Sequence, residues 1–178
     1  MLSRIVIVAI GFLALPVFAR AQSAEVHASA GPTLVDRGHS VAVGGGWSPW
    51  SRLTVTVDVE RTVLATRVTR DGRGGESAFR GGSVVLGAAG VRLALFPPGR
   101  VTPYLVAGVA AGRSRPTVNG RFPVAVTNDA RAIVGGGGLE APLGRRVVVF
   151  ADARVQVGGD GGETLALAPL RVGLRWRF

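Results

Sequence analysis

Hydrophobic and polar residues alternate along several stretches of this 178-residue chain. From Arg52 to Val63, leucine and valine occupy alternate positions, with threonine, aspartate and glutamate between most of them. From Arg146 to Val157, valine and alanine alternate with Asp152, Arg154 and Gln156. A period of two residues predicts β-strands. Strands with one apolar and one charged face are difficult to place in a solid soluble core, and they favour a membrane barrel with a polar interior.

The last stretch shows the same pattern with larger residues. One face carries Leu170, Val172, Leu174, Trp176 and Phe178, and the other carries Arg171, Arg175 and Arg177. We interpret the first face as the lipid contact of the closing strand and the second as part of the interior. Because Pro169 has no N–H to donate to a ladder, the regular part of this strand should begin at Leu170.

The pattern as a whole predicts an all-β fold, an eight-stranded antiparallel up-and-down transmembrane β-barrel. The expected strands cover 24–31, 40–47, 52–63, 79–96, 101–112, 130–141, 146–157 and 170–178. Short connections at 48–51, 97–100 and 143–145 alternate with long polar ones at 64–78 and 114–129 and with short outer loops at 36–39 and 158–163. Short turns on the periplasmic side and longer loops outside are typical of outer-membrane barrels.

Aromatic and glycine positions add detail to this prediction. Trp47, Tyr104, Trp176 and Phe178 lie near the predicted periplasmic ends of their strands, where an aromatic girdle is expected. Glycines cluster at 44–46 and 135–138. At inward positions of a narrow barrel they would relieve crowding.

The first residues have the features of an export signal. Arg4 supplies a positive charge, residues 5–15 form an apolar core, and Ala19-Arg20-Ala21 is a small-x-small cleavage site. We therefore expect a cleavable signal peptide at 1–21 and one barrel domain at 22–178. Cysteine is absent, so neither a disulfide nor a thiolate metal site is expected.

These features together resemble the small bacterial outer-membrane β-barrel family that includes the OmpA transmembrane domain and OmpX. The resemblance rests on the signal ending at Ala21, the run from Pro103 to Gly112, and the terminal Leu174-Arg175-Trp176-Arg177-Phe178. It implies residence in the outer membrane of a Gram-negative bacterium. It also implies insertion by the barrel assembly machinery, which recognises a terminal strand ending in phenylalanine. It transfers no catalytic or binding residue, because loops and roles differ within the family.

Charged residues at inward positions carry both signs. The expected network comprises Asp58, Glu60, Arg80, Arg92, Glu140, Asp152, Arg154, Arg171, Arg175 and Arg177. An eight-stranded barrel is only wide enough for its own side chains, so we expect ion pairs to plug it and the protein to have a structural or surface-interaction role. Since arginine outnumbers acid in this set, a small anion-leaning channel is the alternative.

All basic residues are arginine, and the formal net charge is +10. Loss of Arg4 and Arg20 with the signal leaves 19 basic against 11 acidic residues, a charge of +8. Outer-membrane lipid and lipopolysaccharide are the expected partners, because guanidinium groups bind phosphate well. The candidate contacts are Arg67, Arg70 and Arg73 in one long loop, with Arg113, Arg115 and Arg121 in or beside another. An export signal and the absence of a recognition motif disfavour nucleic acid.

Other chemistry has weaker support in the sequence. His27 and Ser29 share one strand face, and Glu25 is the nearest acid along the chain, so a lipid-modifying barrel enzyme is a second alternative. No spacing of His and carboxylate residues predicts a metal site, and no motif predicts a cofactor. A soluble periplasmic β protein is the remaining alternative.

Overall fold

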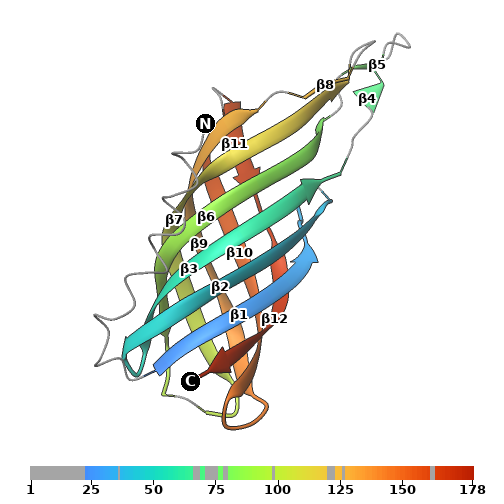
Figure 1. The fold of residues 1–178 in the computed structure, drawn as a ribbon. Helices are drawn as coiled ribbons and strands as arrows, with labels where there is room; N and C mark the ends of the chain where they lie inside the picture. The colour runs from blue at the N-terminus through green and yellow to red at the C-terminus, as the bar shows by residue number, and fades with distance from the viewer. Residues whose placement is uncertain are drawn as a thin grey trace.

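The computed structural model describes residues 23–35, 37–65, 69–70, 76–77, 80–97, 99–119, 123–125, 127–160 and 163–178. Among them, eight long strands form a closed antiparallel ring (Figure 1). They are β1 (Ser23–Pro32), β2 (His39–Trp50), β3 (Leu53–Leu64), β6 (Arg80–Ala94), β7 (Thr102–Asn119), β9 (Asn128–Pro142), β10 (Val147–Asp160) and β12 (Leu170–Arg177). Pairing of β12 with both β10 and β1 closes the ring. The predicted eight-stranded antiparallel barrel is confirmed.

Four short segments complete the strands of the described residues: β4 (Thr69–Arg70), β5 (Glu76–Ser77), β8 (Pro123–Ala125) and β11 (Glu163–Leu167). β8 pairs with β7 beyond the start of β9, and β11 pairs with β10 beyond the start of β12. β4 and β5 pair with each other. Among all the residues that the structure describes, no helix is long and apolar enough to cross a membrane.

The two faces of the strands reverse the burial pattern of a soluble protein. In β3, Asp58 is 3 % exposed, whereas its neighbours Val57 and Val59 are 59 % and 42 % exposed. Because side chains alternate across a strand, Asp58 and Glu60 of β3 point inward and Val55, Val57 and Val59 point outward. An apolar exterior of this kind suits a barrel surrounded by lipid.

The ladders extend further than the sequence analysis predicted. The expected loops at 158–163 and 114–129 are wrong in part, because β10 continues to Asp160, β11 begins at Glu163 and β7 continues to Asn119. Backbone hydrogen bonds hold these extensions, and such bonds do not require apolar side chains. The prediction from hydrophobic alternation therefore stops too early at this end of the barrel.

Pro169 interrupts the last wall of the barrel, between β11 and β12. It forms an isolated bridge with Thr33, and its carbonyl accepts a hydrogen bond of 3.0 Å from the Arg154 N–H. The predicted start of the regular strand at Leu170 is confirmed. The chain pairs with β10 again on the far side of the proline, since Pro169 removes only one donor from the ladder.

Both ends of the described barrel chain meet at one end of the ring. The Phe178 N–H donates to the Ala24 carbonyl at 2.9 Å, and Glu25 lies opposite Arg177 in the ladder. The β2–β3, β6–β7 and β9–β10 connections lie at this same end. We call it the short-turn end, and it corresponds to the predicted periplasmic side.

Three of the four expected girdle aromatics lie on outward positions. Trp176 and Phe178 are exposed and Trp47 is half-buried, all at the short-turn end. Tyr104 is a correction, because it is 2 % exposed and points into the ring. Its neighbour Leu105 faces outward, so strand alternation forces Tyr104 inward. The sequence analysis placed Tyr104 by its distance from the strand end and overlooked its parity.

Candidate functional site

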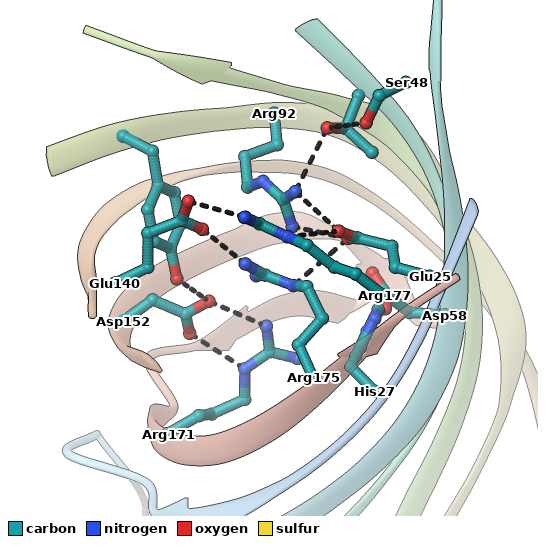
Figure 2. A network of polar contacts seen from close by, with 12 residues as sticks. Glu25, His27, Ser48, Asp58, Arg92, Glu140, Asp152, Arg171, Arg175 and Arg177 are labelled. Atoms are coloured by element: carbon teal, nitrogen blue, oxygen red, sulfur yellow. Dashed lines mark hydrogen bonds and ion pairs between the residues drawn. The ribbon is translucent and has the colours of Figure 1, made fainter. Parts of the chain in front are cut away.

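A network of ion pairs lies inside the barrel toward the short-turn end (Figure 2). It is built from inward positions of six strands, because each strand presents every second side chain to the interior. Among the described interior side chains, five carboxylates face five guanidinium groups: Glu25, Asp58, Glu60, Glu140 and Asp152 with Arg92, Arg154, Arg171, Arg175 and Arg177.

Glu25 and Glu140 form the part of the network nearest the short turns. Glu25 accepts hydrogen bonds of 2.7 and 3.0 Å from Arg92, and its carboxylate lies 3.1 Å from Arg175 Nε. Glu140 accepts from Arg175 and, at 2.9 Å, from Arg177. The expected network omitted Glu25. It lies two residues from His27 on the same strand face, so parity alone could have identified it.

Deeper in the barrel, Asp152 binds two arginines. Arg171 donates to it at 2.9 and 3.0 Å, and Arg154 donates at 3.3 Å. Arg154 also donates to Asp58 at 3.2 Å, and Arg171 lies 3.6 Å from Glu60. These contacts form a continuous chain of opposite charges. Arg171 is 1 % exposed, and its two carboxylate neighbours keep its charge paired away from water.

Two glycines allow polar contacts to form across an intervening strand. Gly44 lies between His27 and Asp58 in the ladders, and an added Cβ would be 2.8 Å from His27 Nε2 and closer to Asp58. Gly138 lies in the same way between Tyr104 and Asp152, and its Cβ would be 2.8 Å from Tyr104 Cζ. Because neither glycine has a side chain, His27 reaches Asp58 and the Tyr104 hydroxyl donates to Asp152 at 3.2 Å.

A cluster of buried apolar side chains lies inside the barrel toward the other end. The buried cluster consists of Val84, Leu86, Ala110, Ala130, Val134, Leu165 and Leu167. Leu165 and Leu167 come from β11, next to the β10–β11 hairpin and remote from the short turns. The ion pairs therefore lie mainly toward the short turns, whereas this cluster lies toward the other end, beside buried polar residues such as Thr62, Ser114 and Gln156. The sequence analysis did not predict this cluster, although Leu165 and Leu167 share the parity of Arg171.

His27 contacts an acid, but not the acid suggested by the sequence. Its Nε2 contacts Asp58, whereas Glu25 binds arginines. Ser29 Oγ and His27 Nδ1 are buried with no hydrogen-bond partner among the described residues, so these two atoms do not contact each other. The Phe150 ring packs edge-on to His27 at 6.0 Å. This geometry fixes the His27 ring but does not activate Ser29, since activation requires a hydrogen bond from the serine to the base.

Solved structures resemble this architecture, although no family model and no curated protein matches the chain. Neisserial surface protein A has 16 % identity and a TM-score of 0.65, over 88 % of this chain and 96 % of that protein. The N-terminal β-barrel domain of Pseudomonas aeruginosa OprF has 14 % identity and a TM-score of 0.62, with 89 % and 98 % covered. A major outer membrane protein from Thermus thermophilus has 17 % identity and a TM-score of 0.59, with 88 % and 98 % covered.

The chain has the fold of a small outer-membrane β-barrel. At these identities the likeness concerns the fold and assigns no role to any residue. Within the described strands of this outer-membrane barrel fold, no group of three or more His, Cys, Asp or Glu side chains is arranged to hold a metal ion.

Most of the arginines expected to contact lipopolysaccharide cannot be placed on this barrel. Arg67, Arg73 and Arg121 lie outside the described residues, and Arg70 and the interior candidate Arg80 are described in backbone only. Arg115 is exposed on β7. Arg113 is also exposed, at another outward position of β7, as are two further arginines, Arg61 on β3 and Arg131 on β9. The sequence prediction did not include Arg61 and Arg131, because it considered basic residues only in and beside the loops.

Proposed function

We propose that the chain is an integral outer-membrane protein of a Gram-negative bacterium, with a closed interior and a structural or surface-interaction role. The ion pairs and the buried apolar cluster inside the ring are the observations that support this proposal. Ion pairs lie toward the short turns, and the cluster around Leu86 and Leu167 lies toward the other end. An ion crossing the barrel would have to displace both. Eight strands leave room only for side chains, so no separate channel fits beside them.

The charge balance of the interior bears on the alternative of an anion-leaning channel. That alternative depended on an excess of arginine over acid. With Glu25 included, the five described guanidinium groups each lie within 4 Å of a carboxylate. In this network, therefore, no excess of arginine over acid remains to attract anions. The proposal therefore favours the plug over the pore.

A planar-bilayer recording tests the closed interior. We expect the purified mature protein to give no conductance steps above those of a protein-free bilayer, with a 16-stranded porin as the positive control. Heat-modifiable gel mobility of the same sample would show that folded protein was used. Stable conductance steps from the folded protein would overturn the plug, and anion selectivity of those steps would establish the channel alternative.

The proposed location includes export and assisted insertion. It is supported by the sequence features of residues 1–21 and by the apolar outward face that ends at Phe178. N-terminal sequencing of the protein from a fractionated outer membrane should begin at Gln22. Recovery in the soluble periplasmic fraction would contradict the location and support the soluble alternative.

We also propose that His27 has a structural role and that the protein is not an enzyme. The support is the contact of His27 with Asp58 inside the barrel, where both are buried and no bulky lipid substrate fits. Lipid A incubated with the folded protein should therefore keep its acyl chains, as judged by mass spectrometry. Acyl loss with the unchanged protein, absent in His27→Ala, would overturn this assignment.

A further inference from the structure

The outer wall of the barrel formed by β3, β6, β7, β9 and β10 carries an open apolar groove. Its volume is about 760 Å³, within the range of about 300–1,000 Å³ that is usual for small-molecule sites. Small outward residues, Gly87, Ala89 and Ala111, lie between larger ones such as Val57 and Val109. The floor is therefore lower than its rim, and the groove is shaped for a flexible apolar chain.

Arg131 lies at the edge of this groove, and two other outward arginines lie on the same wall. Val85 of β6 pairs with Arg61 of β3 in one ladder and with Arg113 of β7 in the other. Arg131 of β9 pairs with Ala111 of β7. The single ion pair of these three guanidinium groups among the described residues is that of Arg113 with Asp129, at 4.0 Å and highly exposed. Such a pair contributes about 0–1 kcal/mol. Within the part of the chain that the structure describes, the wall thus presents three guanidinium groups with one exposed carboxylate beside them.

The arginines mark one boundary of the apolar surface. On β9, the residues from Ile133 to Ala141 lie between Arg131 and the short-turn end, and on β7 the residues from Pro103 to Ala111 lie between Arg113 and that end. Nine residues of tilted strand are about enough to cross the hydrocarbon layer. An arginine that faces lipid destabilises a folded barrel by about 2–4 kcal/mol at the bilayer midplane and by about 0–1 kcal/mol near the interface. The guanidinium groups therefore lie at the level of outer-leaflet headgroups.

We propose that this wall binds lipid A, with an acyl chain in the groove beside Ala111 and a phosphate on Arg61, Arg113 and Arg131. Charge complementarity selects this occupant, because guanidinium forms paired hydrogen bonds with phosphate oxygens. Lipid A combines phosphate with several acyl chains, so it can occupy the groove and neutralise the arginines together. This inference rests on the proposed outer-membrane location, and it adds a specific lipid and a specific wall.

Competition between lipids tests the basic part of the site. The folded mature protein would be incubated with equimolar bisphosphoryl lipid A and phosphatidylglycerol, and retained lipid counted by native mass spectrometry. We expect at least tenfold more lipid A than phosphatidylglycerol on the unchanged protein. The triple variant R61Q/R113Q/R131Q should lose that preference. The matched control R52Q/R100Q/R145Q, which removes the same charge from exposed short-turn positions, should keep it.

Filling the groove tests the apolar part. A Cβ at Gly87 would come no closer than 3.7 Å to another residue, so Gly87→Leu should fold and occupy the groove. Gly135→Leu is the control, because a Cβ there would meet nothing within 4 Å and Gly135 does not line the groove. We expect Gly87→Leu to lower lipid A retention at least threefold and Gly135→Leu to leave it unchanged.

The outcomes separate this inference from the proposed function. Equal retention of both lipids, equal loss in the two triple variants, or no effect of Gly87→Leu would overturn the lipid A site. None of these results would affect membrane insertion, which heat-modifiable gel mobility reports separately. A chain that did not insert would instead contradict the proposed location.

Discussion

The carboxylate of Glu25 and the guanidinium of Arg92 lie 67 residues apart in the chain and meet through hydrogen bonds of 2.7 and 3.0 Å inside the barrel. Glu25 comes from β1 and Arg92 from β6, with β2 and β3 between them in the ring. The contact therefore spans the interior and links two walls that share no backbone ladder. The contribution of this contact to the free energy of unfolding can be measured.

Replacing Glu25 by alanine should lower the free energy of unfolding by about 3–5 kcal/mol, because Arg92 and Arg175 would lose a buried counter-charge. Urea unfolding in lipid vesicles, followed by tryptophan fluorescence, measures the change. Asp129→Ala is the control, since its exposed ion pair contributes about 0–1 kcal/mol. Removing both partners in Glu25→Leu/Arg92→Leu should recover part of the loss. An effect of Glu25→Ala as small as that of the control would show that the pair is unimportant.

The apolar cluster inside the barrel should also contribute to stability. Leu167 is 1 % exposed inside the barrel, and Leu174 is 55 % exposed on its outside. Leu167→Ala should lower the free energy of unfolding by about 2–5 kcal/mol, because it leaves a cavity in a packed cluster. Leu174→Ala should cost clearly less, since lipid fills the space of the missing atoms. The same unfolding measurement compares the two, and equal losses would argue against a packed cluster around Leu167.

Gly44 should tolerate no larger residue. Gly44→Val would place a side chain between His27 and Asp58, where even a Cβ collides, so we expect the folded form to be lost or greatly reduced. Gly135→Val is the matched control in open space. Heat-modifiable gel mobility after refolding measures the folded fraction of each. Efficient folding of Gly44→Val would mean that His27 and Asp58 do not need to meet.

Deleting Phe178 should separate assisted from unassisted insertion. Its side chain is exposed, and its backbone N–H forms one hydrogen bond with Ala24, so its loss should lower intrinsic stability only slightly. In cells, however, the amount of folded protein in the outer membrane should fall several-fold, if the assembly machinery reads the terminal aromatic. Fractionation and refolding yield measure the two effects. Unchanged cellular levels would contradict a role of Phe178 in assembly.

The sequence predicted the features that depend on strict alternation. Val55, Val57 and Val59 of β3 and the arginines of β12 set the two faces of the ring, and these predictions needed no knowledge of tertiary contacts. The start of β12 at Leu170 followed from the missing N–H of Pro169. These features are local consequences of strand geometry and proline chemistry.

Features that depend on pairing between strands were not predicted. Which acid approaches His27 depends on Gly44, which lies between His27 and Asp58 in two ladders. The apolar cluster depends on pairing of β10 with β11, which precedes Pro169 in the chain, and this pairing places Leu165 and Leu167 inside. Alternation assigns a side chain to a face, but register determines which side chains meet.

The arginines of β12 have a consequence for how the ring closes. Arg171 contacts Asp152 on β10 and Glu60 on β3, while Arg175 contacts Glu25 on β1 and Glu140 on β9. Until β1 and β12 pair, Arg175 lacks Glu25 and Arg171 lacks Glu60, so each guanidinium group keeps only one of its two carboxylate partners. An open sheet is therefore penalised by charge as well as by its unpaired backbone edge. Closure of the ring completes the backbone ladder of β12 and its ion pairs in the same step. We therefore expect closure to be cooperative.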